Sequence, residues 1–468
     1  MYYASVVRVL ALLMLIVAAA AVPSVVISFF AGEDSQTFAF IAMILTIIVV
    51  ASSVLLLTPK PSRKAMPSDA LGTVILWWFI TPVVTALPFI LGVDNDSIVR
   101  GLHEATSCLT TTGQSVIDVE NDVWPISLVV WRGMLHLLGG LATIVTAASV
   151  LAALNIGGPG IHRTVLFTVP ETSFFDAVPR VARVVCAMMA ISILALFAAL
   201  VLLGVPAERA LGDTVSVLTT GLVDPAGAGR QPLDTGPSII LGLGLIVGAM
   251  GLAIWLPLRD WKPLKAITDP ELVLFIILIG VFVLAAVLSD LNVTEGLSWA
   301  ISALSTSGLP LSDPNDYQRI PLTVLVLPAL IGGSALSAAG GVKIARLIVL
   351  SRRAGQEFRQ LGYRRSILGF QFRDRELDER SVIGVWVYLI AYIFAVFAVM
   401  IGYSFLGESF DPSIRLSIGS LTNSGAVVGD YASNLNPAAD LLTIFAMILG
   451  RLEILALFPA LSVSFWRG

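Results

Sequence analysis

The stretch Thr110-Thr111-Thr112-Gly113 decides the architecture that this chain predicts. Its pattern is Thr or Asn, then a hydroxyl residue, then Gly, and it returns as Thr219-Thr220-Gly221, Thr306-Ser307-Gly308 and Asn423-Ser424-Gly425. Thr and Ser supply oxygen atoms, and Gly allows backbone dihedrals that aim carbonyl groups where a side chain would obstruct. Four such stretches in the same apolar context disfavour ordinary turns. They predict one pore ringed by four quasi-equivalent segments, which would replace the water shell of a cation inside a membrane.

The composition indicates an integral membrane protein. Hydrophobic residues make up 57% of the 468 residues and charged residues only 13%, and the mean hydropathy is +0.91. A soluble domain carries about twice that charged fraction, so we expect most of the surface to face membrane lipid. A net charge of −4 argues against a nucleic-acid partner. The two cysteines and three histidines show neither a disulfide framework nor metal-ligand spacing.

Apolar runs long enough to cross a bilayer, about 20 residues each, recur along the chain. We place ten of them, at Val6–Phe30, Phe38–Leu57, Leu71–Leu91, Pro125–Leu154, Val181–Leu203, Pro237–Pro257, Glu271–Leu288, Pro321–Leu350, Val382–Leu406 and Ala438–Phe465. Four shorter half-apolar segments each end on one of the triplets: Gly101–Thr112, Glu208–Thr220, Thr294–Ser307 and Pro412–Ser424. A helix that enters the membrane and returns is the natural interpretation, because irregular backbone at that depth must be covered by protein or line a cavity.

The predicted fold is therefore an all-α membrane protein with ten transmembrane helices and four re-entrant pore helices. Four span–pore helix–span repeats surround one pore, and an N-terminal helical hairpin is added to them. The predicted boundaries are 1–66 for the hairpin, then 67–158, 159–266, 267–381 and 382–468 for the repeats. The third repeat includes a charged segment, Ser351–Ser381, which reads either as a cytoplasmic helical connector that docks a partner or as a solvated linker.

Loop charge predicts the orientation. Lys and Arg follow the second, fourth, sixth and eighth spans, as in Arg259, Lys262 and Lys265, whereas the opposite loops are acidic or neutral. The positive-inside rule then places both termini in the cytoplasm. In that orientation all four triplets lie toward the outside.

The triplets are the predicted ion-binding residues of a selectivity filter. These residues are Thr111, Thr112, Gly113, Thr219, Thr220, Gly221, Thr306, Ser307, Gly308, Asn423, Ser424 and Gly425. The C-terminal ends of the pore helices carry partial negative charge and would favour a cation beneath the filter. Two carboxylates near the starts of the first two pore helices, Glu104 and Asp213, read as helix N-terminal charges or, alternatively, as ion ligands.

Two further places break the apolar pattern and are the predicted gate. Gly340 and Gly341, followed by Lys343, end a run of small residues within the eighth span. This run predicts either a broken helix with a loop across the pore or close helix packing through small residues. Arg451 lies near the middle of the last span, where an ionisable residue costs at least ~2.5 kcal/mol and normally faces a cavity or a partner. It is expected either to act as an electrostatic barrier below the filter or to serve as a structural contact by pairing with Glu453 or a neighbouring carbonyl.

These residues together resemble the Trk/Ktr/HKT superfamily of potassium transporters. The resemblance rests on the four triplets, on Gly340 through Arg346, and on the ending that begins Gly450-Arg451-Leu452-Glu453, and the N-terminal hairpin points to the Trk-type membrane subunit. It implies potassium as the transported ion, a homodimer with one pore per protomer, a cell inner-membrane location, and a cytoplasmic ring of nucleotide-binding regulatory subunits. In that superfamily Gly in all four filters goes with potassium. Here the intramembrane loop has fewer glycines than the family pattern, with Ser337-Ala338-Ala339 before the glycine pair.

Two other functions stay open at this point. One is a secondary transporter of a small solute, or a sodium-coupled cation symporter, built from broken helices at mid-membrane. Each repeat here enters from the same side, which disfavours an inverted repeat. The other is a membrane-embedded hydrolase with a Ser or Thr nucleophile, which is disfavoured because the three His residues flank the triplets and do not repeat with them as a general base would. We expect no enzyme activity and no organic cofactor.

Overall fold

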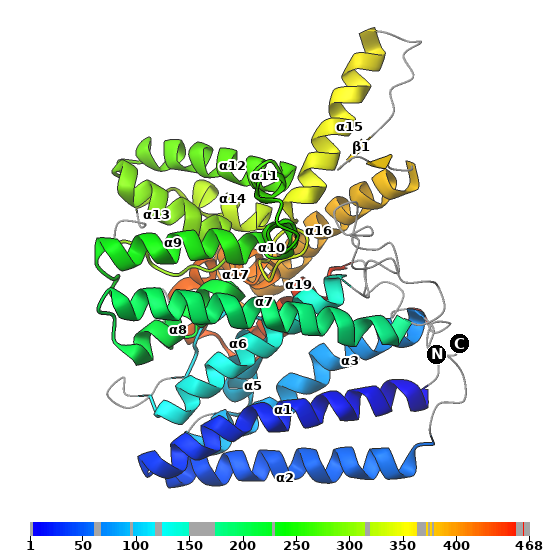
Figure 1. Cartoon of the computed structure of the whole chain (residues 1–468), viewed down its shortest axis with the longest axis vertical. Coiled ribbons are helices and arrows are strands. Elements are labelled where there is room, and N and C mark those ends of the chain that lie inside the picture. The colour runs from blue at the N-terminus through cyan, green and yellow to red at the C-terminus, as the bar shows by residue number, and fades with distance from the viewer. Residues whose placement is uncertain are drawn as a thin grey trace.

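The structure is a computed structural model, and nearly all of its described part is helical. It describes residues 3–59, 67–93, 97–117, 124–148, 174–226, 230–313, 319–362, 371–372, 375–376, 379–454 and 462. Figure 1 shows most long helices running in one common direction, with α1 (Tyr3–Ala31) and α2 (Asp34–Leu57) side by side at one edge of the bundle. An all-helical, multi-span membrane protein is confirmed.

The helices α1 and α2 form the predicted N-terminal hairpin. The Arg8 guanidinium donates to the carbonyl oxygens of Leu55 and Thr58 at 2.8 and 2.6 Å, which ties the start of α1 to the end of α2. The rings of Phe40 and Trp131 meet edge to face with centroids 5.8 Å apart, so the hairpin packs on the first repeat. Because its guanidinium is bound by these carbonyls, Arg8 is tolerated near the end of an otherwise apolar helix.

The remaining helices follow one order four times: a span, a shorter buried helix, then a second span. The first unit holds α3 (Pro67–Thr85), α4 (Leu87–Gly92), α5 (Ile98–Leu109) and α6 (Ile126–Thr146), and the second holds α7 (Phe174–Leu202), α8 (Ala207–Thr219), α9 (Thr235–Met250), α10 (Leu252–Arg259) and α11 (Pro263–Ile267). The third holds α12 (Pro270–Val287), α13 (Val293–Leu304), α14 (Leu322–Ile331) and α15 (Ile344–Gly362), and the fourth holds α16 (Glu379–Phe405), α17 (Phe410–Thr422), α18 (Gly425–Val428), the 3₁₀ helix η6 (Gly429–Asn434) and α19 (Pro437–Leu452). The domain boundaries within this order stay predictions.

The number of straight spans is smaller than ten. In the described part of the chain seven helices are long and apolar enough to cross a membrane, and α9 with α10 makes an eighth if that pair, bent by 90°, counts as one span. The sixth predicted span is therefore broken, not straight. The eighth is also broken, since α14 ends at Ile331 and α15 begins at Ile344. The tenth is helical through Leu452 and described to Ile454.

The bend between α9 and α10 has a local cause. Gly251 takes a positive φ of 48°, which glycine adopts without a Cβ penalty. The freed N–H of Leu252 donates to the carbonyl of Leu336 at 3.1 Å, and a side chain at Gly251 would collide with that same carbonyl. The bend thus makes room for the segment that interrupts the eighth span.

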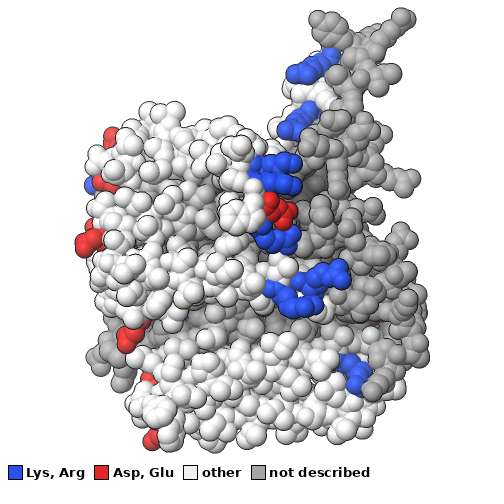
Figure 2. Space-filling view, viewed as in Figure 1, with Lys and Arg blue, Asp and Glu red and all other residues white. Residues whose placement is uncertain are grey.

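Charged side chains are segregated along the helix direction. Figure 2 shows Lys and Arg gathered toward one end of the bundle, over α10, α11 and the base of α15, and Asp and Glu mostly at the opposite end. Arg259, Lys262 and Lys265 are exposed at the basic end. This agrees with the loop-charge pattern, while the assignment of that end to the cytoplasm stays a prediction.

The charged connector is helical in its first part and again from Glu379, where α16 begins. The helix α15 projects beyond the body of the bundle (Figure 1) and ends at Gly362. Beyond it, β1 (Gln371–Phe372) and β2 (Arg375–Glu376) pair antiparallel. Arg364 and Arg365 lie outside the described residues.

Candidate functional site

The four pore helices end in the same backbone turn. One residue of each filter segment takes a left-handed conformation, and its φ is 55° at Thr111, 53° at Thr220, 60° at Thr306 and 52° at Asn423. A residue other than glycine in this region costs roughly 1–2 kcal/mol, and it persists where the surroundings determine the backbone. The turn therefore depends on Thr and Asn as well as on Gly, a point that the sequence pattern did not reveal.

The second segment is displaced by one residue relative to the others. The carbonyl of Ser107 accepts from Thr112 N at 2.9 Å, and the carbonyl of Gly419 accepts from Ser424 N at 2.8 Å. The matching bond in the second segment runs from Gly221 N to the Ser216 carbonyl, 3.0 Å. Gly221 thus occupies the place of Thr112 and Ser424, and Leu222 occupies the place of Gly113.

This register corrects the expectation that the four triplet glycines are equivalent. The left-handed residue lies two positions before Gly113, Gly308 and Gly425 but one position before Gly221. Contacts of an equivalent serine agree with this alignment. Ser107 Oγ donates to Gln114 O at 2.7 Å, and Ser216 Oγ accepts from Val223 N at 3.1 Å, so Val223 occupies the place of Gln114. Three glycines and one leucine therefore hold the position that follows the turn.

The four segments meet in cyclic order. A side chain at Gly113 would collide with the backbone of Leu222, and one at Gly308 would collide with Ala426. A side chain at Gly425 would meet the Thr112 carbonyl, which closes the ring between the fourth and first segments. Between the second and third segments, Ser307 Oγ donates to the Gly221 carbonyl at 3.4 Å. The structure thus brings all four predicted filter segments together around one centre.

Glycines on the second spans let the pore helices approach closely. Side chains at Gly139, Gly248 and Gly450 would collide with the carbonyls of Leu109, Val217 and Leu421, respectively. These carbonyls belong to the last turns of α5, α8 and α17, where the helix dipole concentrates negative charge. This packing was missed from the sequence, although Gly139-Gly140 and Gly450 in mid-span were a readable signal.

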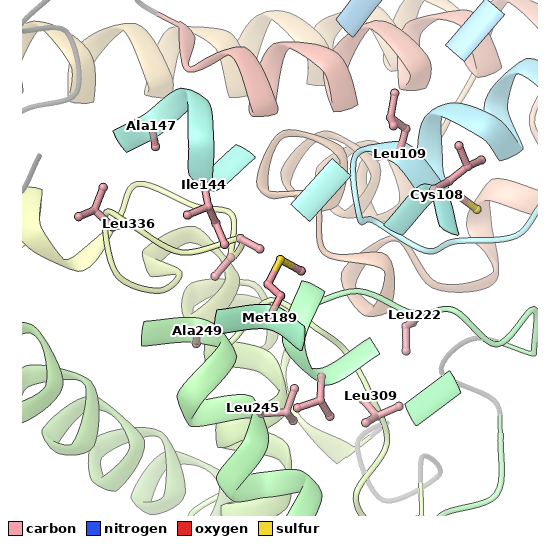
Figure 3. Close-up of a cluster of buried hydrophobic side chains, with 14 of the residues drawn as sticks. Cys108, Leu109, Ile144, Ala147, Met189, Leu222, Leu245, Ala249, Leu309 and Leu336 are labelled. Atoms are coloured by element: carbon pink, nitrogen blue, oxygen red, sulfur yellow. The ribbon is translucent and has the colours of Figure 1, made fainter. Parts of the chain in front are cut away.

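Buried apolar residues anchor the filter in the core. Figure 3 shows Cys108 and Leu109 from α5 together with Leu222 and Leu309, which follow the second and third turns. Leu109, Leu222 and Leu309 are at most 1% exposed. Their side chains tie the backbone on either side of the turns to the same cluster as Leu245 and Ala249 of α9.

The interrupted span forms a loop, residues 332–343, that lies against the filter. The Gly340 N–H donates to the Thr306 hydroxyl at 2.9 Å, and a side chain at Gly340 would collide with the Thr422 carbonyl. Two bonds hold the loop on its other side, from Ala335 N to the Glu271 carboxylate at 3.0 Å and from Ser334 N to the Ala249 carbonyl at 2.9 Å. The broken helix, one of the two readings of this run, is the one observed.

Lys343 closes the loop. Its φ is 78° and its side chain is buried, with the ammonium donating to the carbonyls of Ala339 and Ser337. The Lys343 ammonium therefore donates its hydrogen bonds to the backbone of the loop itself.

Arg451 contacts both the filter and the loop. Its guanidinium donates to the Thr110 carbonyl and the Thr111 hydroxyl on one side and to the Ala338 carbonyl on the other. Glu453 pairs instead with Arg346, whose guanidinium also lies 3.8 Å from the ring centroid of Tyr388. Pairing of Arg451 with Glu453 is therefore wrong, whereas the predicted pairing with carbonyl groups is observed.

Glu104 and Asp213 are neither helix N-terminal charges nor free ligands. Glu104 lies in the middle of α5, fully buried, and forms an ion pair with Arg132 of α6. Asp213 pairs with Arg230 at 2.5 Å. Neither Arg132 nor Arg230 was singled out from the sequence, although Arg132 interrupts the apolar fourth span.

The oxygen atoms of the site come from backbone carbonyls and hydroxyls. Within the part of the chain that the structure describes, no group of three or more His, Cys, Asp or Glu side chains could hold a metal ion. Carbonyl and hydroxyl oxygens are the ligands that suit a dehydrated monovalent cation in a pore.

A bundle of membrane-spanning helices around four re-entrant turns defines a cation-conducting membrane protein. The chain belongs to the TrkH family, described as cation transport proteins, whose pattern matches residues 35–217 and 267–464. The resemblance to Trk-type membrane subunits is thereby confirmed, and with it the expectation of a transport protein and not an enzyme.

Individual relatives agree with this assignment. The chain is 27% identical over 414 residues to the Trk system potassium uptake protein TrkH of Salmonella typhimurium, covering 84% of this chain and 85% of the relative. It is 26% identical over 438 residues to the Trk system potassium uptake protein TrkG of Escherichia coli, covering 88% of each. The crystal structure of the potassium transporter TrkH from Vibrio parahaemolyticus shares the fold, with a TM-score of 0.87, 22% identity and 100% of both chains covered.

Proposed function

We propose that the protein takes up K⁺ across the cell membrane through a pore lined by the four filter segments. The observation that carries this proposal is the ring of left-handed turns at Thr111, Thr220, Thr306 and Asn423, each placed at the C-terminal end of a buried pore helix. Such turns gather carbonyl and hydroxyl oxygens around one centre, and the helix ends favour a cation beneath them. The Trk-system relatives named above, which carry potassium uptake in their names, support K⁺ as the ion.

The proposed gate is the loop 332–343 together with Arg451. The loop touches the third and fourth filter segments, and Arg451 joins it to the first. A fixed positive charge at that level raises the barrier for a cation, because at about 6 Å and an effective dielectric near 20 two unit charges repel by roughly 3 kcal/mol. Opening would require Arg451 and the loop to leave the filter.

The proposed assembly is a homodimer in the cell inner membrane with cytoplasmic termini and a cytoplasmic nucleotide-binding regulatory subunit. Exposed Arg259, Lys262 and Lys265, with the projecting helix α15, form the basic end on which such a subunit would dock. The positive-inside rule supports placing this end in the cytoplasm.

A flux measurement tests the proposed function. The purified protein in K⁺-loaded liposomes, with protein-free liposomes as the baseline, should accumulate external ⁸⁶Rb⁺, because outward diffusion of K⁺ through the protein makes the lumen negative. Excess external K⁺ should compete with the tracer, whereas choline should not. Uptake no greater than in empty liposomes, with the protein folded and inserted, would contradict K⁺ transport by this chain alone.

A further inference from the structure

Arg132 lies behind the filter and contacts two of its segments. Its guanidinium is fully buried in α6 and donates from Nη2 to the Gly113 carbonyl at 2.8 Å and to the Leu222 carbonyl at 3.2 Å. Its Nε donates to the Val223 carbonyl at 2.8 Å. Gly113 and Leu222 hold equivalent places after their turns, so one side chain binds the matching carbonyls of the first and second segments.

Glu104 completes the arrangement from the pore helix. One carboxylate oxygen pairs with Arg132, and the other accepts from Val116 N and Ser115 Oγ, each at 3.1 Å. The pair therefore ties α5, α6 and the residues after both turns into one unit. Loss of one partner from such a buried pair is far more costly than loss of both, because a lone buried charge is left behind.

The arrangement is specific to this side of the ring. The second segment has Leu222 where the others have glycine, and neither Leu222 nor Gly425 of the fourth segment takes the positive φ that Gly113 and Gly308 share. Its carbonyl is nonetheless held by the same guanidinium nitrogen as the Gly113 carbonyl. Arg132 thus holds the Leu222 carbonyl in an orientation that the backbone conformation of Leu222 alone does not set.

We propose that Arg132, neutralised by Glu104, is a positioning pair that sets the carbonyl orientation of the first and second filter segments and so contributes to ion selection. The proposal rests on the proposed K⁺ transport function. Peptide units held by strong donors keep the neighbouring filter oxygens from closing around a smaller ion, since hydrogen bonds to charged groups are stronger than neutral ones. Neutralisation by Glu104 also keeps the guanidinium from repelling a cation in the adjacent filter.

The test compares the K⁺ over Na⁺ permeability ratio, from reversal potentials in proteoliposomes, among three variants. Arg132→Lys keeps the charge, but one ammonium cannot serve the carboxylate and three carbonyls together. We expect its ratio to fall about three- to tenfold, as loss of one hydrogen bond of ordinary strength would produce. The double variant Glu104→Gln/Arg132→Gln leaves no buried charge unpaired and should show a similar fall in the permeability ratio.

Trp131→Phe is the matched control. It removes a buried hydrogen bond on the same helix, from Nε1 to the Thr85 carbonyl at 3.2 Å, and does not touch the filter.

The outcomes separate the two proposals. A wild-type protein that conducts K⁺, with an unchanged ratio in folded Arg132→Lys or in the folded double variant, overturns the positioning role and leaves K⁺ transport standing. A ratio that falls equally in Trp131→Phe also overturns it, since general loosening of α6 would then suffice. A wild-type protein that conducts no cation overturns both proposals.

Discussion

The Gly340 N–H donates a hydrogen bond to the hydroxyl of Thr306, 2.9 Å away, so the loop that interrupts the eighth span touches the filter directly. Thr306 is also the residue whose φ of 60° turns the third segment. A movement of the loop must therefore break a bond to a filter residue. This relationship places the proposed gate against the filter and not at a distance from it.

Replacing Arg451 with Ala should raise basal flux and leave K⁺ preference largely intact. The change removes the donors to Thr110, Thr111 and Ala338, and thus both the charge and the link between loop and filter. Loss of one hydrogen bond to a charged group should raise the equilibrium constant for opening roughly tenfold. The measurement is ⁸⁶Rb⁺ flux normalised to folded protein.

Glu453→Gln is the control for Arg451, because Glu453 pairs with Arg346 and not with Arg451. This variant should lower thermal stability without raising flux per folded molecule, since it leaves the buried Arg346 without its carboxylate. A stable Arg451→Ala protein with wild-type or lower flux would contradict the gate.

Replacing Gly340 with Ala should displace the loop. The new methyl group would collide with the Thr422 carbonyl, and overpacking of this kind typically costs about 1–3 kcal/mol. We expect a lower melting temperature in detergent and a higher basal flux. The same substitution at Gly355 of α15, where a Cβ meets nothing within 4 Å, should leave both unchanged. Equal effects at the two glycines would argue against close contact between loop and filter.

Replacing Gly113 with Ser should reduce the preference for K⁺ over Na⁺. Gly113 has a φ of 79°, and an added side chain would collide with the backbone of Leu222 in the neighbouring segment. Reversal potentials under mixed K⁺ and Na⁺ gradients measure the effect. Gly280→Ser, on α12 with open space around it, serves as the control and should behave as wild type. An unchanged ratio in the Gly113 variant would remove this residue from ion selection.

Reversing charge at Lys262 and Lys265 should weaken binding of a cytoplasmic regulatory subunit. Both residues are exposed at the basic end of the bundle. Pairing between exposed charges is screened over about 8–10 Å at physiological salt, so the loss should be greatest at low ionic strength. Co-purification at low and high salt measures it, and undiminished binding at both would place the contact elsewhere. Reversal at Arg364 and Arg365, which belong to the charged segment Ser351–Ser381, tests the connector separately.

Much of the architecture could be predicted from local properties of the sequence. The apolar runs gave α1, α2, α7, α12 and α16 within a few residues at most ends, because burial in lipid requires a long continuous apolar segment. The four pore helices and their turns followed from short half-apolar segments that end on hydroxyl residues and glycine. The paired glycines between Gly332 and Gly341 indicated a break in the eighth span as one of two readings, the other being close helix packing.

Other features depended on partners that are distant in the chain. Gly251 allows the sixth span to bend, but the bent backbone also depends on the Leu336 carbonyl, which accepts from the N–H of Leu252, and no residue within the span identifies that acceptor. Likewise, Glu104 and Asp213 looked like helix N-terminal charges, since the arginines that neutralise them lie on other segments.

The sequence by itself determined that this chain crosses a membrane many times and carries four re-entrant turns, because hydropathy, glycine content and hydroxyl side chains act within a few residues. Only the tertiary structure decided how those turns align, with Leu222 in the place of a glycine, and which partners the buried charges take. Arg451 lies two residues from Glu453, yet it binds the Thr110 carbonyl 341 positions away. The physical reason is that a buried charge must find compensating dipoles wherever the packed helices bring them, and that choice is made in space and not along the chain.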